Sequence, residues 1–375
     1  MKRFIKILIF AVAAAALGII AGCAGCVSCG GCAGCGGSQT NSVLTSSNWY
    51  TGTSYPGIQP SFIVEDGYAD YAERLEYGVA FEKPESANSS YSVNYSDGEY
   101  TTEFYAVRFD WNGGKTLDRE GFRADEKEVL YCFKTLLKIK VQYELKNGDK
   151  SEVFEDSVET ESYFRAAGKS LQPVYSYRRT VSASPAGYSA SAVDEAYEKI
   201  DVTYENYYDR ECKNVIYFIN GEEQDAVELD DLSNTLFDND YLYIAIRSMT
   251  LTENFSKQIS LFSGSNGLDD YTVSGSSKTL SENEIKQVSA ALEKKGLFKP
   301  QEDATTVRTV AADINIASGK FQGTTQTVWY AALPENKDSD NVSRSTLLKI
   351  SIPVPYNLGT LNLTLSKVNS TLWNN

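Results

Sequence analysis

The stretch Leu137-Lys-Ile-Lys-Val-Gln-Tyr-Glu-Leu145 alternates apolar and polar residues without a break. A period of two puts every second side chain on the same face, so the stretch predicts a β-strand with one buried and one wet face. Asn147-Gly148 follows, and this dipeptide is typical of a two-residue hairpin turn because both residues tolerate positive φ angles. Val153-Phe154 then belongs to the returning strand, which predicts an antiparallel hairpin.

Turn signals of this kind recur between apolar segments of period two. They predict three further hairpins, and a succession of hairpins indicates an antiparallel meander rather than alternating strand–helix units. The predicted turns are Asp97-Gly98 between strands at 91–95 and 100–104, Asn220-Gly221 after a strand at 215–219, and Ser318-Gly319 between strands at 307–316 and 321–333.

The C-terminal end predicts one more strand pair, at 348–354 and 361–365, joined through Asn357-Leu-Gly359. Proline has no N–H to donate to a strand ladder. Pro353 and Pro355 therefore predict that the first of these strands lies at a sheet edge.

A helix at 282–295 has the clearest boundaries. Ser281 is a good N-cap, and Glu284 completes the Ser-x-x-Glu capping box. Gly296 fits the left-handed position after the last turn, and Pro300 prevents continuation. These signals agree, so the segment predicts a well-capped helix.

Two segments are less regular. Ala192–Lys199 fits a short helix ahead of a strand at Asp201–Tyr208, whereas Asp238–Arg247 fits either a helix or a strand. With the hairpins, these elements predict an α+β, β-rich fold of antiparallel sheets, in which the helix at about 282–295 is the one well-capped helix.

The composition limits the functions open to the chain. Of its 375 residues, 42% are hydrophobic and 23% charged, which indicates a folded core, and the net charge of −15 makes nucleic acid an unfavourable partner. Histidine is absent, so Ser-His-Asp and Cys-His catalysis and histidine-ligated metals are excluded. There is also no Ser-x-x-Lys motif and no phosphate-binding loop. We therefore predict no catalytic residues, no metal and no cofactor.

The N-terminus joins the basic residues Met1-Lys-Arg3 and Lys6 to an apolar stretch from Ile7 to Ile20. This order is typical of a signal peptide, and the apolar stretch is too short for a stable membrane span. It ends in the tetrad Ile20-Ala-Gly-Cys23, which resembles the lipobox of bacterial lipoproteins.

The resemblance implies cleavage between Gly22 and Cys23. It also implies a diacylglycerol on the sulfur of Cys23 and a further acyl chain, such as palmitate, on the new amine. Two or three acyl chains anchor a protein stably. The folded part would then face the space outside the cytoplasm, at the cell membrane or, as Ala24 allows, at the outer membrane.

Four more cysteines, Cys26, Cys29, Cys32 and Cys35, continue the spacing of three that starts at Cys23. Such spacing resembles iron–sulfur and zinc ligand runs, but only small residues fill the gaps and no carboxylate or histidine is nearby to orient ligands. Disulfides or free thiols, extra lipidation and a metal cluster all stay open, with the metal cluster the least favoured.

The chain organisation follows from these segments. The expected parts are a signal peptide at 1–22, a Cys-rich tether and flexible linker at 23–60, an antiparallel β-rich domain at 61–231 and an α+β domain at 232–375. In the folded part, Cys132 and Cys212 either pair or stay as buried thiols.

Tyrosine and acidic clusters are the remaining candidates for chemistry. Tyrosine stacks well on sugars, but strands favour tyrosine in any case. Acidic groups suit calcium, but no twelve-residue calcium loop occurs, so we predict solvated surface charge. The tyrosine clusters are Tyr204, Tyr207 and Tyr208, or Tyr175 and Tyr177; the acidic stretches are Glu222–Asp231 and Asp238–Asp240; and Ser274–Lys278 predicts a polar surface loop.

Three functional hypotheses follow. The first is a non-enzymatic lipoprotein that binds a ligand, an envelope glycan, a lipid or a protein partner. The second is a carrier of lipid or another apolar ligand, in a cavity lined by residues such as Ile139, Val141 and Tyr143. The third is a carboxylate-dependent glycan hydrolase with two facing acids, one of raised pKa. The segments Asp238-Asn-Asp240 and Tyr356–Thr360 resemble uncharacterised bacterial lipoprotein domains, which implies no activity.

Overall fold

The computed structural model describes residues 73–84, 91–109, 117–123, 125, 128–145, 148, 150–167, 170–184, 198–229, 236–247, 249, 251, 254–265, 267–302, 304–316, 324–332, 346–354 and 358–369. The first strands are β1 (Glu73–Glu82), β2 (Tyr91–Phe109), β3 (Glu128–Leu145), β4 (Phe154–Ala167), β5 (Ser170–Ser184), β6 (Glu198–Tyr208), β7 (Asn214–Ile219), β8 (Glu222–Glu223) and β9 (Val227–Glu228). The later elements are β10 (Leu236–Asp238), the 3-10 helix η2 (Asn239–Tyr241), α1 (Leu242–Arg247), β11 (Ser256–Ser263), β12 (Gly267–Ser276), α2 (Glu282–Glu293), β13 (Thr309–Ile316), β14 (Thr325–Ala331), β15 (Leu347–Val354) and β16 (Gly359–Asn369).

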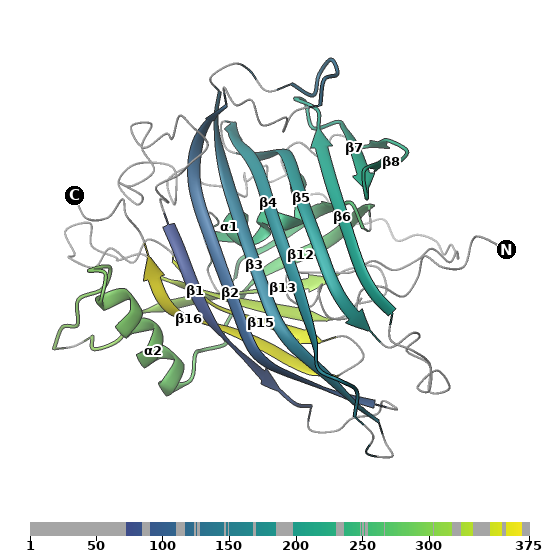
Figure 1. The fold of residues 1–375 in the computed structure, drawn as a ribbon. Helices are drawn as coiled ribbons and strands as arrows, with labels where there is room; N and C mark the ends of the chain where they lie inside the picture. The colour runs from purple at the N-terminus through teal and green to yellow at the C-terminus, as the bar shows by residue number, and fades with distance from the viewer. Residues whose placement is uncertain are drawn as a thin grey trace, which may run out of the picture.

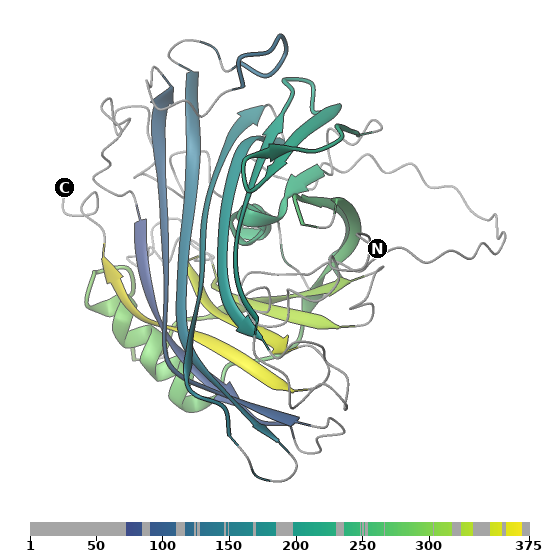
Figure 2. The same cartoon turned by 45° about the vertical axis from the view of Figure 1, so that its right-hand side comes forward.

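All sixteen strands belong to one sheet. Its order is β10-β11-β12-β13-β14-β15-β16-β1-β2-β3-β4-β5-β6-β7-β8, with β9 also paired to β7. The described pairs are antiparallel except β10 with β11. The long strands β1 to β6 form one wall, and the strands β11 to β16 cross it at an angle (Figures 1 and 2). The predicted β-rich, antiparallel α+β fold is confirmed.

The hairpin predicted from the 137–145 stretch is confirmed. Strands β3 and β4 pair antiparallel from Val141↔Phe154 to Tyr131↔Phe164. Ile139, Val141 and Tyr143 are buried, whereas the alternating lysines of the same strand are exposed. The period-two pattern therefore sorts β3 into a core face and a wet face, as it predicts.

The turn predicted at Asp97-Gly98 is wrong. Strand β2 runs straight through this dipeptide, which forms a bulge because Ser96↔Lys140 is followed by Glu99↔Lys138. This bulge uses the left-handed backbone conformation that a tight turn also uses, since Asp97 has φ 47°. Val79 of β1 also packs closely against Gly98, and a Cβ at position 98 would lie only 2.5 Å from Val79 Cβ.

The turn predicted at Asn220-Gly221 is confirmed. Asn220 has φ 52° and Gly221 has φ 79°, and they join β7 to β8 through the pair Ile219↔Glu222. The turn predicted at Ser318-Gly319 lies outside the described residues, although the strands around it, β13 and β14, pair antiparallel.

One pairing joins the two ends of the described chain. Strand β16 pairs with β1 from Arg74↔Asn369 to Glu82↔Thr360, so strands of 61–231 and of 232–375 share one sheet. The division near residue 232 stays a prediction. The junction places the C-terminal strands beside the N-terminal wall.

The edge-strand prediction for β15 is wrong. This strand lies between β14 and β16, as the pairs Ser351↔Thr327 and Ser351↔Asn362 show. The ladder between β15 and β14 runs from Leu347 to Ser351. Pro353 lies beyond this ladder, so its missing N–H leaves no carbonyl of β14 without a donor. Proline therefore marks the end of one ladder and not the edge of the sheet.

Two local predictions on helices differ in outcome. The helix α2 is confirmed, with Ser281 N donating to Glu284 Oε2 at 2.9 Å in the capping box. It lies on β16, where Gln287 Nε2 donates to Leu365 O at 3.0 Å. The helix predicted at 192–199 is wrong for its last two residues, because β6 begins at Glu198. Residues 192–197 lie outside the described residues.

Candidate functional site

A short internal segment lies between the two walls of the sheet. It consists of the end of β10, η2 and α1, and its residues from Asp238 to Arg247 are all buried. Tyr241 OH donates to Leu171 O of β5 at 3.1 Å, and Tyr330 OH of β14 donates to Tyr243 O at 2.8 Å. The segment therefore touches both walls and fills space between them.

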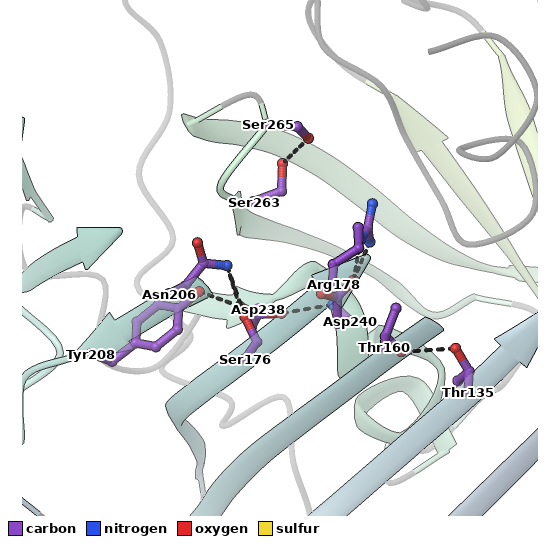
Figure 3. Close-up of polar contacts among 10 residues, drawn as sticks. All are labelled: Thr135, Thr160, Ser176, Arg178, Asn206, Tyr208, Asp238, Asp240, Ser263 and Ser265. Atoms are coloured by element: carbon purple, nitrogen blue, oxygen red, sulfur yellow. Dashed lines mark hydrogen bonds and ion pairs between the residues drawn. The ribbon is translucent and has the colours of Figure 1, made fainter. Parts of the chain in front are cut away.

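Asp238 is the centre of a buried polar cluster on the inner face of β5 and β6 (Figure 3). Its carboxylate accepts hydrogen bonds from Ser176 Oγ at 2.6 Å, from Asn206 Nδ2 at 3.3 Å and from Tyr208 OH. It also caps η2, because Asp240 N donates to Asp238 Oδ1 at 2.8 Å. Four donors thus surround one carboxylate, which leaves little acceptor capacity for a ligand.

Arg178 and Asp240 form a buried ion pair beside this carboxylate. Arg178 Nε lies 2.9 Å from Asp240 Oδ1, and a second guanidinium nitrogen donates to the same oxygen. Burial opposes the positive charge, but Asp240 holds the pKa of Arg178 above its usual range. The pair attaches η2 to β5, because a buried charge left alone would be costly.

Burial shifts the proton affinity of Asp238. Desolvation, followed by the nearby carboxylate of Asp240, raises the pKa of Asp238 to about 6, and the hydrogen bonds from Ser176 and Tyr208 oppose that rise. A raised carboxyl pKa is a feature of general acids. A general acid must also reach its substrate, whereas Asp238 is only 1% exposed.

A second buried ion pair holds the other end of the segment. Arg247 binds Glu73 of β1 in a bidentate pair, with Nη1–Oε1 at 2.6 Å and Nη2–Oε2 at 2.9 Å. Both side chains are almost fully buried. The internal segment is therefore attached by charge to β5 at its start and to β1 at its end. We infer that these charges have a structural role.

The acidic stretches divide in the structure. Glu222, Glu223, Asp225 and Glu228 are exposed, as predicted. The prediction of solvated charge at Asp238–Asp240 is wrong, because Arg178 and four hydrogen-bond donors compensate these carboxylates inside the protein. Local sequence does not reveal this, because the compensating arginine lies 62 positions away.

The predicted surface loop Ser274–Lys278 is partly a strand. Ser274 and Ser276 belong to β12 and pair with β13. Lys278 Nζ lies 3.0 Å from Asp313 Oδ1 and 2.7 Å from Thr327 Oγ1. These two contacts attach the end of the Lys278 side chain to β13 and β14.

The tyrosine clusters separate by face. Tyr204 and Tyr208 face the inside, and Tyr208 serves the Asp238 cluster. Tyr175, Tyr177 and Tyr207 lie on the opposite face of β5 and β6, because they pair directly across these strands with each other or with Glu205. The strand period of two thus splits a cluster that looks contiguous in sequence.

The predicted thiol sites lie partly outside the structure. Gly22, Cys23, Cys26, Cys29, Cys32 and Cys35 are not among the described residues. Cys132 and Cys212 are buried free thiols and do not pair. Burial raises the pKa of each to about 12, which makes both poor nucleophiles. Within the described ranges, no group of His, Cys, Asp or Glu side chains is placed to hold a metal ion.

The side chains suggested for the carrier cavity are packed in the core, and the two buried acids of the internal segment already have partners. Ile139, Val141 and Tyr143 belong to the same hydrophobic cluster as the side chains of α1. Asp238 and Asp240 are buried and already hydrogen-bonded or ion-paired. In the part of the chain described here, no helix is long and apolar enough to span a membrane.

A scan against protein-family models and a search of curated proteins found no match to the chain.

Proposed function

We propose that the chain is a lipid-anchored protein that works outside the cytoplasm and binds a partner without catalysing a reaction. The observation that carries this proposal is the tetrad Ile20-Ala-Gly-Cys23 behind a basic and apolar leader. The cysteine would carry the diacylglycerol, and the residues up to 60 would hold the sheet away from the membrane. The anchor fixes where the protein works.

The buried cluster supports a binding role over a catalytic one. Asp238 has the raised pKa that a general acid needs, but its acceptor sites are used by Ser176, Asn206, Tyr208 and the η2 backbone. Its neighbour Asp240 neutralises Arg178. Groups that satisfy each other inside a core stabilise the fold. They do not present a reactive atom to a substrate.

The anchor is tested by metabolic labelling with an alkyne fatty acid. We expect the wild-type chain and Cys26→Ser to be labelled, and Cys23→Ser to be unlabelled, because lipidation needs the sulfur that follows Gly22. Intact mass should show a mature chain that starts at Cys23 with two or three acyl chains. In detergent phase partitioning, the labelled proteins should enter the detergent phase, and unlabelled Cys23→Ser should stay in the aqueous phase.

Two results would contradict the proposal. One is a native chain that keeps its leader and carries no acyl group. The other is equal labelling of wild type and Cys23→Ser, which would place the lipid elsewhere. Cys26→Ser is the matched control, because it removes a thiol of the same tract and leaves the tetrad intact.

A further inference from the structure

The outer face of β4, β5, β6 and β7 carries a row of acidic and aromatic residues. Glu161 pairs across to Tyr177, Tyr177 to Glu205, and Glu205 to Phe218. These four strands lie side by side in Figure 1. The four side chains are partly exposed, and Glu159, two residues before Glu161 on the same face, is exposed. We call these five residues the Tyr177 face.

Buried tyrosines fix the orientation of the two carboxylates beside Tyr177. Tyr163 OH donates to Glu161, and Tyr175 OH and Tyr207 OH donate to Glu205 Oε2 at 3.3 Å and 3.0 Å. The rings of Tyr175 and Tyr207 are 5.0 Å apart, which packs the donors against each other. Carboxylates held in this way lose little entropy when they bind a ligand.

The charge of this face is not balanced. Glu161 has Lys134 at 3.4 Å, and Arg179 is bound by Asp201 in a bidentate pair at 2.9 Å and 2.8 Å. Glu159 lies directly across from Arg179, but the guanidinium of Arg179 is bound by Asp201, and no salt bridge joins Glu159 or Glu205 to a lysine or arginine among the described residues. The chain as a whole carries a net charge of −15, so its field attracts cations toward such a face.

We propose that the Tyr177 face binds a partner polypeptide through lysine or arginine side chains. The cation would lie over the ring of Tyr177, where the aromatic quadrupole attracts it, between the carboxylates of Glu161 and Glu205. This inference rests on the proposed function and names the chemistry of the partner that the anchored protein binds.

The same observations argue against other occupants. Phosphate-bearing lipids and anionic polymers meet like charge on this face. A neutral sugar could stack on the ring and donate its hydroxyls to the carboxylates, but it carries no charge and gains nothing from the negative field of the chain. A cationic segment gains from both the carboxylates and the ring, so charge complementarity selects it.

The test is binding of a synthetic oligolysine peptide to the full chain in a neutral detergent, measured by calorimetry. We expect binding that weakens as ionic strength rises and disappears when the lysine amines are acetylated. Tyr177→Leu should weaken binding about threefold and Tyr177→Phe should keep it, because only the latter retains the ring. Glu159→Gln together with Glu205→Gln should weaken it about fivefold or more.

Glu282→Gln is the matched control for charge, because Glu282 is an exposed acid on α2, away from this face. It should bind as wild type does. Equal affinity of wild type, Tyr177→Leu and the double glutamine variant would overturn the inference, as would equal binding of the acetylated peptide or of a neutral chitin oligosaccharide. These outcomes leave the fatty-acid label on Cys23 unaffected, so failure here is distinct from failure of the anchor.

Discussion

The two faces of β4 to β6 use the same residue types in opposite ways. On the inner face, Arg178 neutralises Asp240 and four donors surround Asp238. On the outer face, Glu159 lies across from Arg179, which is bound by Asp201, and no salt bridge involves Glu159 or Glu205 among the described residues. Burial makes compensation obligatory on one side, because an unpaired charge in the core costs several kcal/mol. Water removes that demand on the other side and leaves charge available for binding.

The largest expected effect comes from neighbouring arginines of β5 that face opposite sides. Arg178→Met removes the buried partner of Asp240 and should lower the free energy of unfolding by about 3–5 kcal/mol. Arg179→Met should change it little, because that ion pair is solvated. Urea unfolding followed by circular dichroism measures both. Similar losses for the two variants would contradict the contrast between the faces.

Next in size is the pH dependence that Asp238 imposes. Burial raises its folded-state pKa from 3.8 to about 6. The folded chain therefore holds a proton that the unfolded chain has released, and stability falls as pH rises from 3.8 through about 6. This fall should amount to about 3 kcal/mol, since one pKa unit is worth about 1.4 kcal/mol.

The variant Asp238→Asn should not lose stability over this pH range, even if it is more or less stable than the wild type at any single pH. Urea unfolding across this pH range should show the wild type losing stability relative to the variant as pH rises. Parallel pH curves would show that Asp238 titrates normally and is not desolvated.

A smaller effect is expected where the β11–β12 turn meets the Asp238 cluster. A Cβ at Gly264 would lie 2.7 Å from Asn206 Oδ1 and 3.2 Å from Tyr204 Cβ. Gly264→Ala should therefore lower stability by about 1–3 kcal/mol through overpacking. Gly78→Ala is the control, because its nearest neighbour would be 4.0 Å away. Thermal unfolding that ranks the two equally would show that the turn yields freely.

The smallest expected change in stability comes from a buried pair of threonine hydroxyls, which is compared with a single threonine on the outer face. Thr135 Oγ1 and Thr160 Oγ1 are 2.8 Å apart on the inner face. Thr160→Val should cost about 1 kcal/mol, and the double variant with Thr135→Val should recover part of it, because neither hydroxyl is then left alone. Thr101→Val, on the outer face of β2, should stay near wild type. A strictly additive double variant in urea unfolding would show that the pair is not coupled.

Much of the fold could be predicted because its signals are local. The alternation at 137–145, the Asn220-Gly221 turn and the capping box at Ser281 each depend on residues within a few positions. The errors arose where one local signal serves two structures. Asp97-Gly98 suits a bulge as well as a turn, and Pro353 suits the end of a ladder as well as an edge.

The candidate site was less predictable because its partners are distant in sequence. Asp238-Asn-Asp240 reads as surface charge until Arg178, Ser176 and Tyr208 are placed around it. The Tyr177 face likewise needs the register of β4, β5 and β6, which no segment specifies alone.

The sequence by itself determined the antiparallel strands, the capped helix and the acidic, histidine-free chemistry, since each follows from composition or from near neighbours along the chain. It also carries the lipobox-like tetrad on which the proposed anchor depends. Only the tertiary structure decided that β16 pairs with β1 within one sheet, which carboxylates are buried and which face is left charged. These outcomes depend on which strands meet, and pairing across hundreds of residues is selected by the whole core and not by local preference.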